Sequence, residues 1–162
     1  VVDTGLGTMT GGRVRRVRDY IGDEPFMLTY GDGVSDLDIT KLLEFHRSHG
    51  RMVTMSAYNA GQRFGVLDVA EDGRIREFRE KTQGDGSLIN IGFMVCQPEF
   101  IDCIGGDSTV LEKAPLERVA KMGQLMAYKH SGFWQCMDTV REKETLEKLW
   151  AAGQAPWKVW AD

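Results

Sequence analysis

The stretch that decides the fold is Phe26-Met-Leu-Thr-Tyr-Gly-Asp-Gly-Val-Ser-Asp36. Its first five residues are apolar or β-prone, which predicts a short buried strand that stops at Gly31-Asp32-Gly33. In open α/β sheets, ligands bind in the crevice beyond the carboxyl ends of the strands. An aspartate held there between two glycines suits a hard cation such as Mg²⁺ shared with substrate phosphates. Taken alone, the same motif also fits a simple turn.

Further strands and helices alternate on either side of this stretch. Asp38 and Thr10 are typical N-caps, Pro115 suits a first helical turn, and Glu71-Asp-Gly73 predicts a hairpin. The other expected strands cover 52–58, 65–69, 74–78, 88–95 and 125–128, and the expected helices cover 9–20, 115–121, 139–152 and segments that begin at 38 and 98. The alternation predicts an α/β fold with a mixed, mostly parallel sheet in one domain, residues 1–162.

Composition excludes some classes of function. The formal net charge of −4 gives no basic field for nucleic acid or for an anionic membrane surface, so an anionic substrate needs local cations or a metal ion. No apolar run approaches the length that crosses a bilayer. The three cysteines are an odd number without metal-type spacing, which favours free thiols in the cytoplasm.

A second acidic candidate lies far along the chain, in Met137-Asp-Thr139. Asp138 could cap the last helix, or it could meet Asp32 across a cleft and complete a metal site, and the spacing does not decide between these. Arg13 follows two glycines near a helix start, where phosphates bind well. Lys81 could offer its ammonium to a phosphate or form a surface ion pair with Glu80.

Taken together, the motifs resemble the bacterial glucose-1-phosphate cytidylyltransferases, within the sugar-phosphate nucleotidylyltransferase family. The resemblance covers the whole chain, and many motifs in one order are far more specific than any single motif. Those that carry it are Val2-Asp-Thr-Gly5, Met9-Thr-Gly-Gly-Arg13, Thr29-Tyr-Gly-Asp-Gly-Val34, Arg63-Phe-Gly65, Phe78-Arg-Glu-Lys81, Gly84-Asp-Gly86, Ile89-Asn-Ile-Gly-Phe93, Phe133-Trp-Gln135 and Met137-Asp-Thr139.

The resemblance implies a Rossmann-like nucleotide-diphospho-sugar transferase fold. It implies that CTP and α-D-glucose 1-phosphate give CDP-glucose and pyrophosphate with Mg²⁺, on a route to the dideoxysugars of bacterial surface polysaccharides such as lipopolysaccharide O-antigen. It also implies a homo-oligomer. The residues that match family positions are Asp32 and Asp138 for the metal, Thr8, Arg13 and Gly31 for the nucleotide, and Glu80, Lys81, Asn90 and Gly92 for the sugar phosphate, with Lys81 as a catalytic cation.

This sequence departs from the family pattern in three ways. It lacks the Gly-rich loop that cradles the triphosphate, so we expect an N-terminally truncated fragment that is inactive alone. Thr82 and Cys136 stand where proline is usual. The alternatives are a nucleotidylyltransferase for another base or sugar, and a catalytically dead module for binding or assembly.

Overall fold

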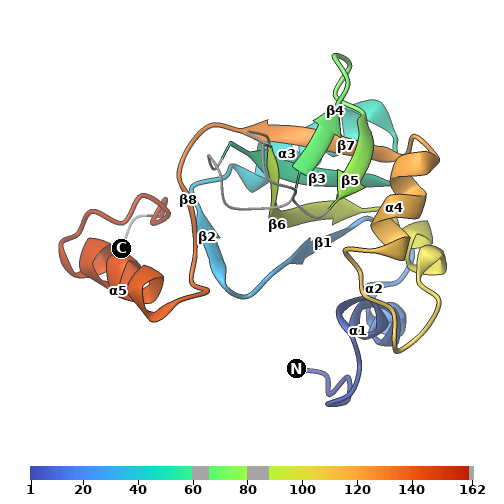
Figure 1. Cartoon of the computed structure of the whole chain (residues 1–162), viewed down its shortest axis with the longest axis horizontal. Coiled ribbons are helices and arrows are strands. Elements are labelled where there is room, and N and C mark those ends of the chain that lie inside the picture. The colour runs from blue at the N-terminus through green and yellow to red at the C-terminus, as the bar shows by residue number, and fades with distance from the viewer. Residues whose placement is uncertain (60–65, 80–87, 161–162) are drawn as a thin grey trace.

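The computed structural model describes residues 1–59, 66–79 and 88–160, and its centre is a four-stranded sheet. The strands follow the order β1 (Phe26–Thr29), β6 (Ile89–Cys96), β3 (Val53–Tyr58) and β7 (Leu125–His130) (Figure 1). β6 is antiparallel to β1 and β3, while β3 is parallel to β7. β1, β3 and β7 therefore run in one direction and β6 runs against them. The expected α/β fold with a mixed, mostly parallel sheet is confirmed.

Alternation along β6 buries side chains on both faces of this sheet. Met94 packs into the larger cluster, and the next residue, Val95, packs into the smaller one. The larger cluster includes Phe100 from the 3₁₀ helix η1 (Pro98–Cys103) and Leu116 from α4 (Ala114–Lys121). The smaller cluster includes Leu42 from α3 (Ile39–His49), so α3 and α4 cover opposite faces.

The helix caps match the sequence in part. Asp38 caps α3 as predicted, because its side chain accepts a hydrogen bond from the Lys41 N–H at 3.0 Å. The cap of α5 (Val140–Ala151) is Thr139, which forms a reciprocal capping box with Glu142. The interpretation of Asp138 as the N-cap is therefore wrong, and its carboxylate has no capping role.

The N-terminal helix differs from the expected single element. It consists of α1 (Thr10–Arg16) and α2 (Arg18–Ile21), separated at Val17. Thr10 is the first helical residue rather than the cap, because its hydroxyl bonds to the 111–112 loop instead. Gly12 lies so close to this loop region that an added Cβ would stand 2.5 Å from the carbonyl oxygen of Asp107. A glycine is needed there for α1 to dock.

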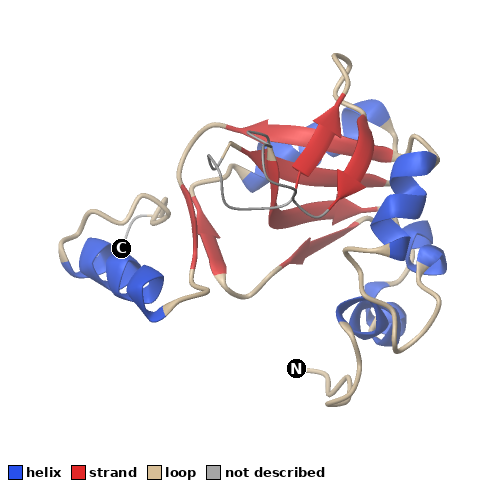
Figure 2. Cartoon of the chain, viewed as in Figure 1, coloured by secondary structure: helices blue, strands red, loops and turns tan. Residues whose placement is uncertain are grey.

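Two small ribbons complete the fold (Figure 2). β4 (Val66–Val69) and β5 (Ile75–Arg79) form the expected hairpin, and β2 (Gly33–Ser35) pairs antiparallel with β8 (Trp134–Cys136). Beyond β8 the chain leads into α5, which lies apart from the main sheet in Figure 1. Trp157 of the following tail stacks on Phe133 with ring centroids 5.5 Å apart. Within the described residues, no helix has the length and apolar character needed to traverse a bilayer.

Candidate active site

The β2–β8 ribbon brings together the two segments that carry the predicted metal ligands. Gly33 lies opposite Cys136 in the ladder, and the Met137 N–H donates to the carbonyl oxygen of Asp32 at 2.8 Å. This last bond extends the pairing by one residue, so that Asp32 faces Met137 across the ribbon and Asp138 comes next. The side chains of Asp32 and Asp138 are both exposed. Two segments remote in sequence, each carrying one of the predicted aspartates, therefore lie side by side at one end of the ribbon.

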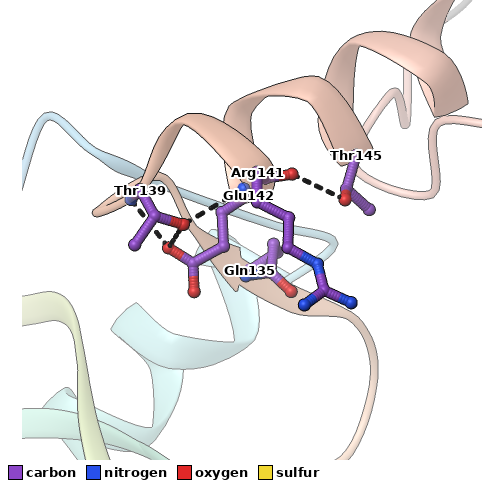
Figure 3. A pocket seen from close by; sticks show the side chains of 5 residues that line it. All are labelled: Gln135, Thr139, Arg141, Glu142 and Thr145. Carbon is purple, nitrogen blue, oxygen red and sulfur yellow. Dashed lines mark hydrogen bonds between the residues drawn. The ribbon is translucent and has the colours of Figure 1, made fainter.

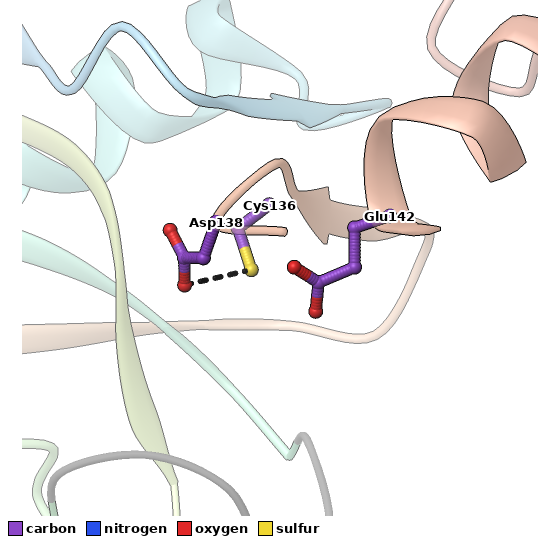
Figure 4. A group of neighbouring side chains, drawn as sticks. All are labelled: Cys136, Asp138 and Glu142. Atoms are coloured by element: carbon purple, nitrogen blue, oxygen red, sulfur yellow. Dashed lines mark hydrogen bonds between the residues drawn. The ribbon is translucent and has the colours of Figure 1, made fainter. Parts of the chain in front are cut away.

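Figure 4 shows Asp138 with two other potential ligand groups, Cys136 and Glu142. The thiol of Cys136 donates to the Asp138 Oδ2 at 3.4 Å. One atom from each of Cys136, Asp138 and Glu142 lies within 4.8 Å of the others. One carboxylate oxygen of Glu142 already takes part in the helix cap, because its Oε2 accepts from the Thr139 N–H at 2.9 Å. The carboxylate of Asp138 therefore points into a cluster of acidic and sulfur groups rather than into open solvent alone.

The Cys136 thiol stays protonated near neutral pH. Burial raises its pKa to about 11, with the hydrogen bond and the charge of Asp138 adding to the effect. A neutral thiol is a weak nucleophile and brings no negative charge to the neighbouring carboxylate. This agrees with the sequence-based interpretation of Cys136 as a bystander.

Tyr30 joins the end of β1 to the predicted sugar-phosphate strand. Its hydroxyl accepts from Asn90 Nδ2 at 3.2 Å, and its N–H donates to the Gly92 carbonyl at 3.3 Å. Gly92 has φ of +84°, and an added Cβ there would lie 2.5 Å from the Tyr30 ring. Gly31 and Asp32 follow directly. The structure thus brings Asn90 and Gly92 together at the Tyr30 side chain, one residue before Gly31.

A carboxylate that the sequence did not single out lies behind this ring. Glu112 Oε1 accepts from the Tyr30 hydroxyl at 2.8 Å, and its Oε2 accepts from the Thr10 hydroxyl at 2.9 Å. Burial raises the pKa of Tyr30, and the negative charge of Glu112 raises it further. The phenol therefore remains a hydrogen-bond donor. No short motif marks Glu112, since its partners are remote in sequence.

The predicted nucleotide residues Thr8 and Arg13 lie at the N-terminus, around α1. Thr8 is buried, and its N–H donates to the Gly5 carbonyl at 3.3 Å. The Arg13 guanidinium donates to the Thr4 hydroxyl at 2.7 Å and to the Leu6 carbonyl at 3.4 Å. These contacts hold the loop of residues 4–9 against α1. Thr10, between the two, connects this loop to Glu112.

Two predicted residues, Glu80 and Lys81, lie outside the described residues, as does Thr82. Their roles stay predictions. The structure adds a feature that the sequence did not indicate, a pocket of about 440 Å³ beside the start of α5 (Figure 3). The five residues that line it all have polar or charged side chains: Gln135, Thr139, Arg141, Glu142 and Thr145.

His130 has an acidic partner that sequence spacing did not reveal. Its Nε2 lies 3.0 Å from Asp36 Oδ1, and the same oxygen accepts from the Phe133 N–H at 2.7 Å. The pair closes the loop between β7 and β8, where Gly132 leaves no space for a Cβ beside Asp36. His130 therefore holds the ribbon that carries Asp138.

Comparison with known proteins assigns the family. Residues 6–140 match the family model described as nucleotidyl transferase. The chain is 52% identical to the glucose-1-phosphate cytidylyltransferase of Salmonella typhi over 99% of its own length and 62% of that protein. It is 42% identical to a probable glucose-1-phosphate cytidylyltransferase of Bacillus subtilis over 98% of its length, again covering 62% of that protein. The chain thus spans less than two thirds of these relatives.

A solved structure has the same fold. The putative glucose-1-phosphate thymidylyltransferase of Bacillus anthracis, crystallised in complex with a sucrose, superposes with a TM-score of 0.76 at 16% identity, over 98% of this chain and 65% of that one. At this identity the likeness establishes the Rossmann-like nucleotidyltransferase architecture and nothing finer. From the fold, the joined aspartate segments and the match over residues 6–140, we conclude that the chain belongs to the nucleotidyl transferase family.

Proposed function

We propose that this chain provides the metal and sugar-phosphate side of a glucose-1-phosphate cytidylyltransferase, which makes CDP-glucose and pyrophosphate from CTP and α-D-glucose 1-phosphate. The observation that supports the proposal is the β2–β8 ribbon, which pairs the backbone segments that carry Asp32 and Asp138. Identity of 52% over nearly the whole chain supports the choice of base and sugar. The product would serve the synthesis of bacterial surface polysaccharides.

The donor set fits Mg²⁺. Hard cations take oxygen ligands, and Mg²⁺ in particular is held by one or two carboxylates together with substrate phosphates. Asp32 and Asp138 would supply those carboxylates, while the protonated thiol of Cys136 leaves the set oxygen-based. Bound there, Mg²⁺ would neutralise charge on the phosphates.

The chain's own residues would bind and orient the substrates. Arg13 and the loop around Thr8 would contact the nucleotide, and Gly31 would let it approach the backbone at the end of β1. Asn90 and Gly92 would line the sugar-phosphate side. Lys81 would place a positive charge by the phosphate oxygen that attacks the α-phosphorus of CTP. The attack is direct, so no side chain needs to act as a covalent nucleophile.

Calorimetric titration tests the assignment. CDP-glucose should bind the purified chain in the presence of Mg²⁺ and much more weakly in EDTA. Asp32→Asn and Asp138→Asn should each reduce the Mg²⁺-dependent affinity about tenfold or more, because each removes a charged ligand. Asp23→Asn, at an exposed site, is the matched control. Binding that is indifferent to Mg²⁺ and to both substitutions would refute the proposed site.

The same titration compares bases and tests the alternatives. CDP-glucose should bind more tightly than UDP-glucose or dTDP-glucose. A reversed order would indicate a nucleotidylyltransferase for another base. Self-association, which we also propose, is measured separately by light scattering on the chromatographed chain.

A further inference from the structure

The strongest feature outside the predicted site is the bridge that Glu112 forms between two distant hydroxyls. Its two carboxylate oxygens accept separately, one from Tyr30 at 2.8 Å and the other from Thr10 at 2.9 Å. The Thr10 oxygen in turn accepts from the Leu111 N–H at 2.9 Å, which fixes the direction of the hydroxyl hydrogen toward Glu112. Hydrogen bonds to an ionised carboxylate are stronger than those between neutral groups.

The two ends of this bridge belong to different parts of the site. Thr10 begins α1 and lies between Thr8 and Arg13. Tyr30 precedes Gly31-Asp32 and receives a hydrogen bond from Asn90 at 3.2 Å. Glu112 therefore connects the segment proposed to bind the nucleotide with the strand proposed to bind the sugar phosphate.

The neighbouring backbone leaves the bridge little freedom to move. Asn90 Oδ1 accepts from the Gly92 N–H at 2.9 Å while its Nδ2 donates to Tyr30, so this amide is oriented on both sides. Gly92 packs directly against the Tyr30 ring. On the other side, the Gly11 N–H donates to the Thr109 carbonyl at 2.9 Å. A displacement of α1 would therefore shift Glu112 and Tyr30, and through the Tyr30 hydroxyl it would disturb the hydrogen bond from Asn90.

We propose that Glu112 is a positioning residue, which holds the nucleotide segment and the sugar-phosphate strand in one fixed relation. The inference rests on the proposed function, since the two segments take their roles from it. A ligand that contacts both segments, such as a nucleotide sugar, gains more binding affinity from this arrangement than a ligand that contacts only one segment. The reason is that a preformed relation removes part of the ordering cost of binding.

A double-mutant cycle on unfolding tests the connection without any ligand. Thr10→Val and Tyr30→Phe each remove one hydroxyl that reaches Glu112. Measured by urea denaturation, the two should be coupled by about threefold or more in the unfolding equilibrium constant. In a Glu112→Ala background the coupling should vanish. Strictly additive effects in the unaltered background would overturn the proposal.

Ligand titrations test the positioning role. In the presence of Mg²⁺, Glu112→Ala should weaken CDP-glucose about tenfold and weaken CTP or glucose 1-phosphate about threefold or less. Glu112→Gln, which keeps one acceptor oxygen, should recover part of the loss. Glu117→Ala, an exposed carboxylate on α4, is the control. A purely structural role predicts equal losses for all three ligands, and equal losses or none would overturn the inference.

The two proposals fail in different ways. If the unaltered chain binds none of these ligands, the proposed function is wrong and the positioning role falls with it. The unfolding cycle still shows in that case whether Glu112 connects the two segments.

Discussion

The Met137 N–H and the Asp32 carbonyl are hydrogen-bonded at 2.8 Å. The bond joins the loop after the first strand of the sheet to the segment just before the last helix. Because it involves only main-chain atoms, substitution of either aspartate side chain leaves it intact. Charge-removing variants at Asp32 and Asp138 should therefore report on ligand binding rather than on folding, as the tests of the proposed function require.

Replacing Gly92 should destabilise the protein strongly. In Gly92→Ala, the new Cβ meets the Tyr30 ring at 2.5 Å, and the backbone φ of +84° is unfavourable for alanine. We expect a loss of about 2–4 kcal/mol in the free energy of unfolding, measured in urea. Gly106→Ala is the control, since no neighbouring atom lies within 4 Å of its Cβ, and it should change stability by less than about 0.5 kcal/mol. Equal effects at both sites would contradict the close packing.

Removing the cap of α5 should cost about 1 kcal/mol. In Thr139→Ala, the Glu142 N–H loses its acceptor and the capping box is broken. Thr145→Ala provides the comparison, because Thr145 lies in the middle of α5 and its hydroxyl donates to the Arg141 carbonyl. Its effect should be close to zero. An unchanged denaturant midpoint in Thr139→Ala would show that the capping box does not contribute to stability.

Stability should fall as the pH is lowered from about 6.5 toward 4. Burial lowers the pKa of His49 to about 4, with positive charge on His46 and Arg51 adding to the shift, and burial also lowers the pKa of His46. The unfolded chain takes up protons first, so the stabilisation is complete above the unfolded value of about 6.5 and is lost as pH falls through the folded value.

Urea titrations at pH 7.5 and pH 5 measure this effect. His49→Gln should flatten the dependence, because glutamine can still bond to Thr54 but does not titrate. Both the original chain and the His49→Gln variant keep His130, so any difference between them comes from position 49. A His49→Gln variant with the same pH dependence as the original chain would rule out this origin.

The thiols should react slowly with an aromatic disulfide reagent at pH 8. Burial raises the pKa of Cys96, Cys103 and Cys136, so little thiolate is present in the folded chain. Cys103, the only partly exposed thiol of the three, should react first. All should react rapidly in urea. Prompt reaction of Cys136 in the folded chain would show that the ribbon opens readily.

The sequence predicted elements with local signals and missed those that depend on distant partners. Asp38 caps α3 because an acceptor before an amphipathic run is a local feature. Thr10 was misassigned because its partner, Glu112, is remote in the chain. For α5, Asp138 and Thr139 are adjacent and both good caps, and only the reciprocal bond with Glu142 selects Thr139.

The ordered motifs predicted which residues belong to the candidate site, but not how these residues are arranged in space. Motif matching identified Asp32 and Asp138, whereas the ribbon that joins them became visible only in the structure. Glu112 and the pairing of His130 with Asp36 carry no motif, since a carboxylate beside a remote hydroxyl or imidazole leaves no pattern in the sequence. The metal and substrate roles of all these residues stay predictions.

The pairing of β2 with β8 has a consequence for the order of folding. Its two strands are separated by most of the chain, and closing so long a loop is entropically slower than forming a hairpin such as β4–β5. During synthesis, β1 and its glycine loop emerge long before β8 exists. The ribbon that joins the segments of Asp32 and Asp138 can thus form only after β8 has been synthesised, about a hundred residues after β2.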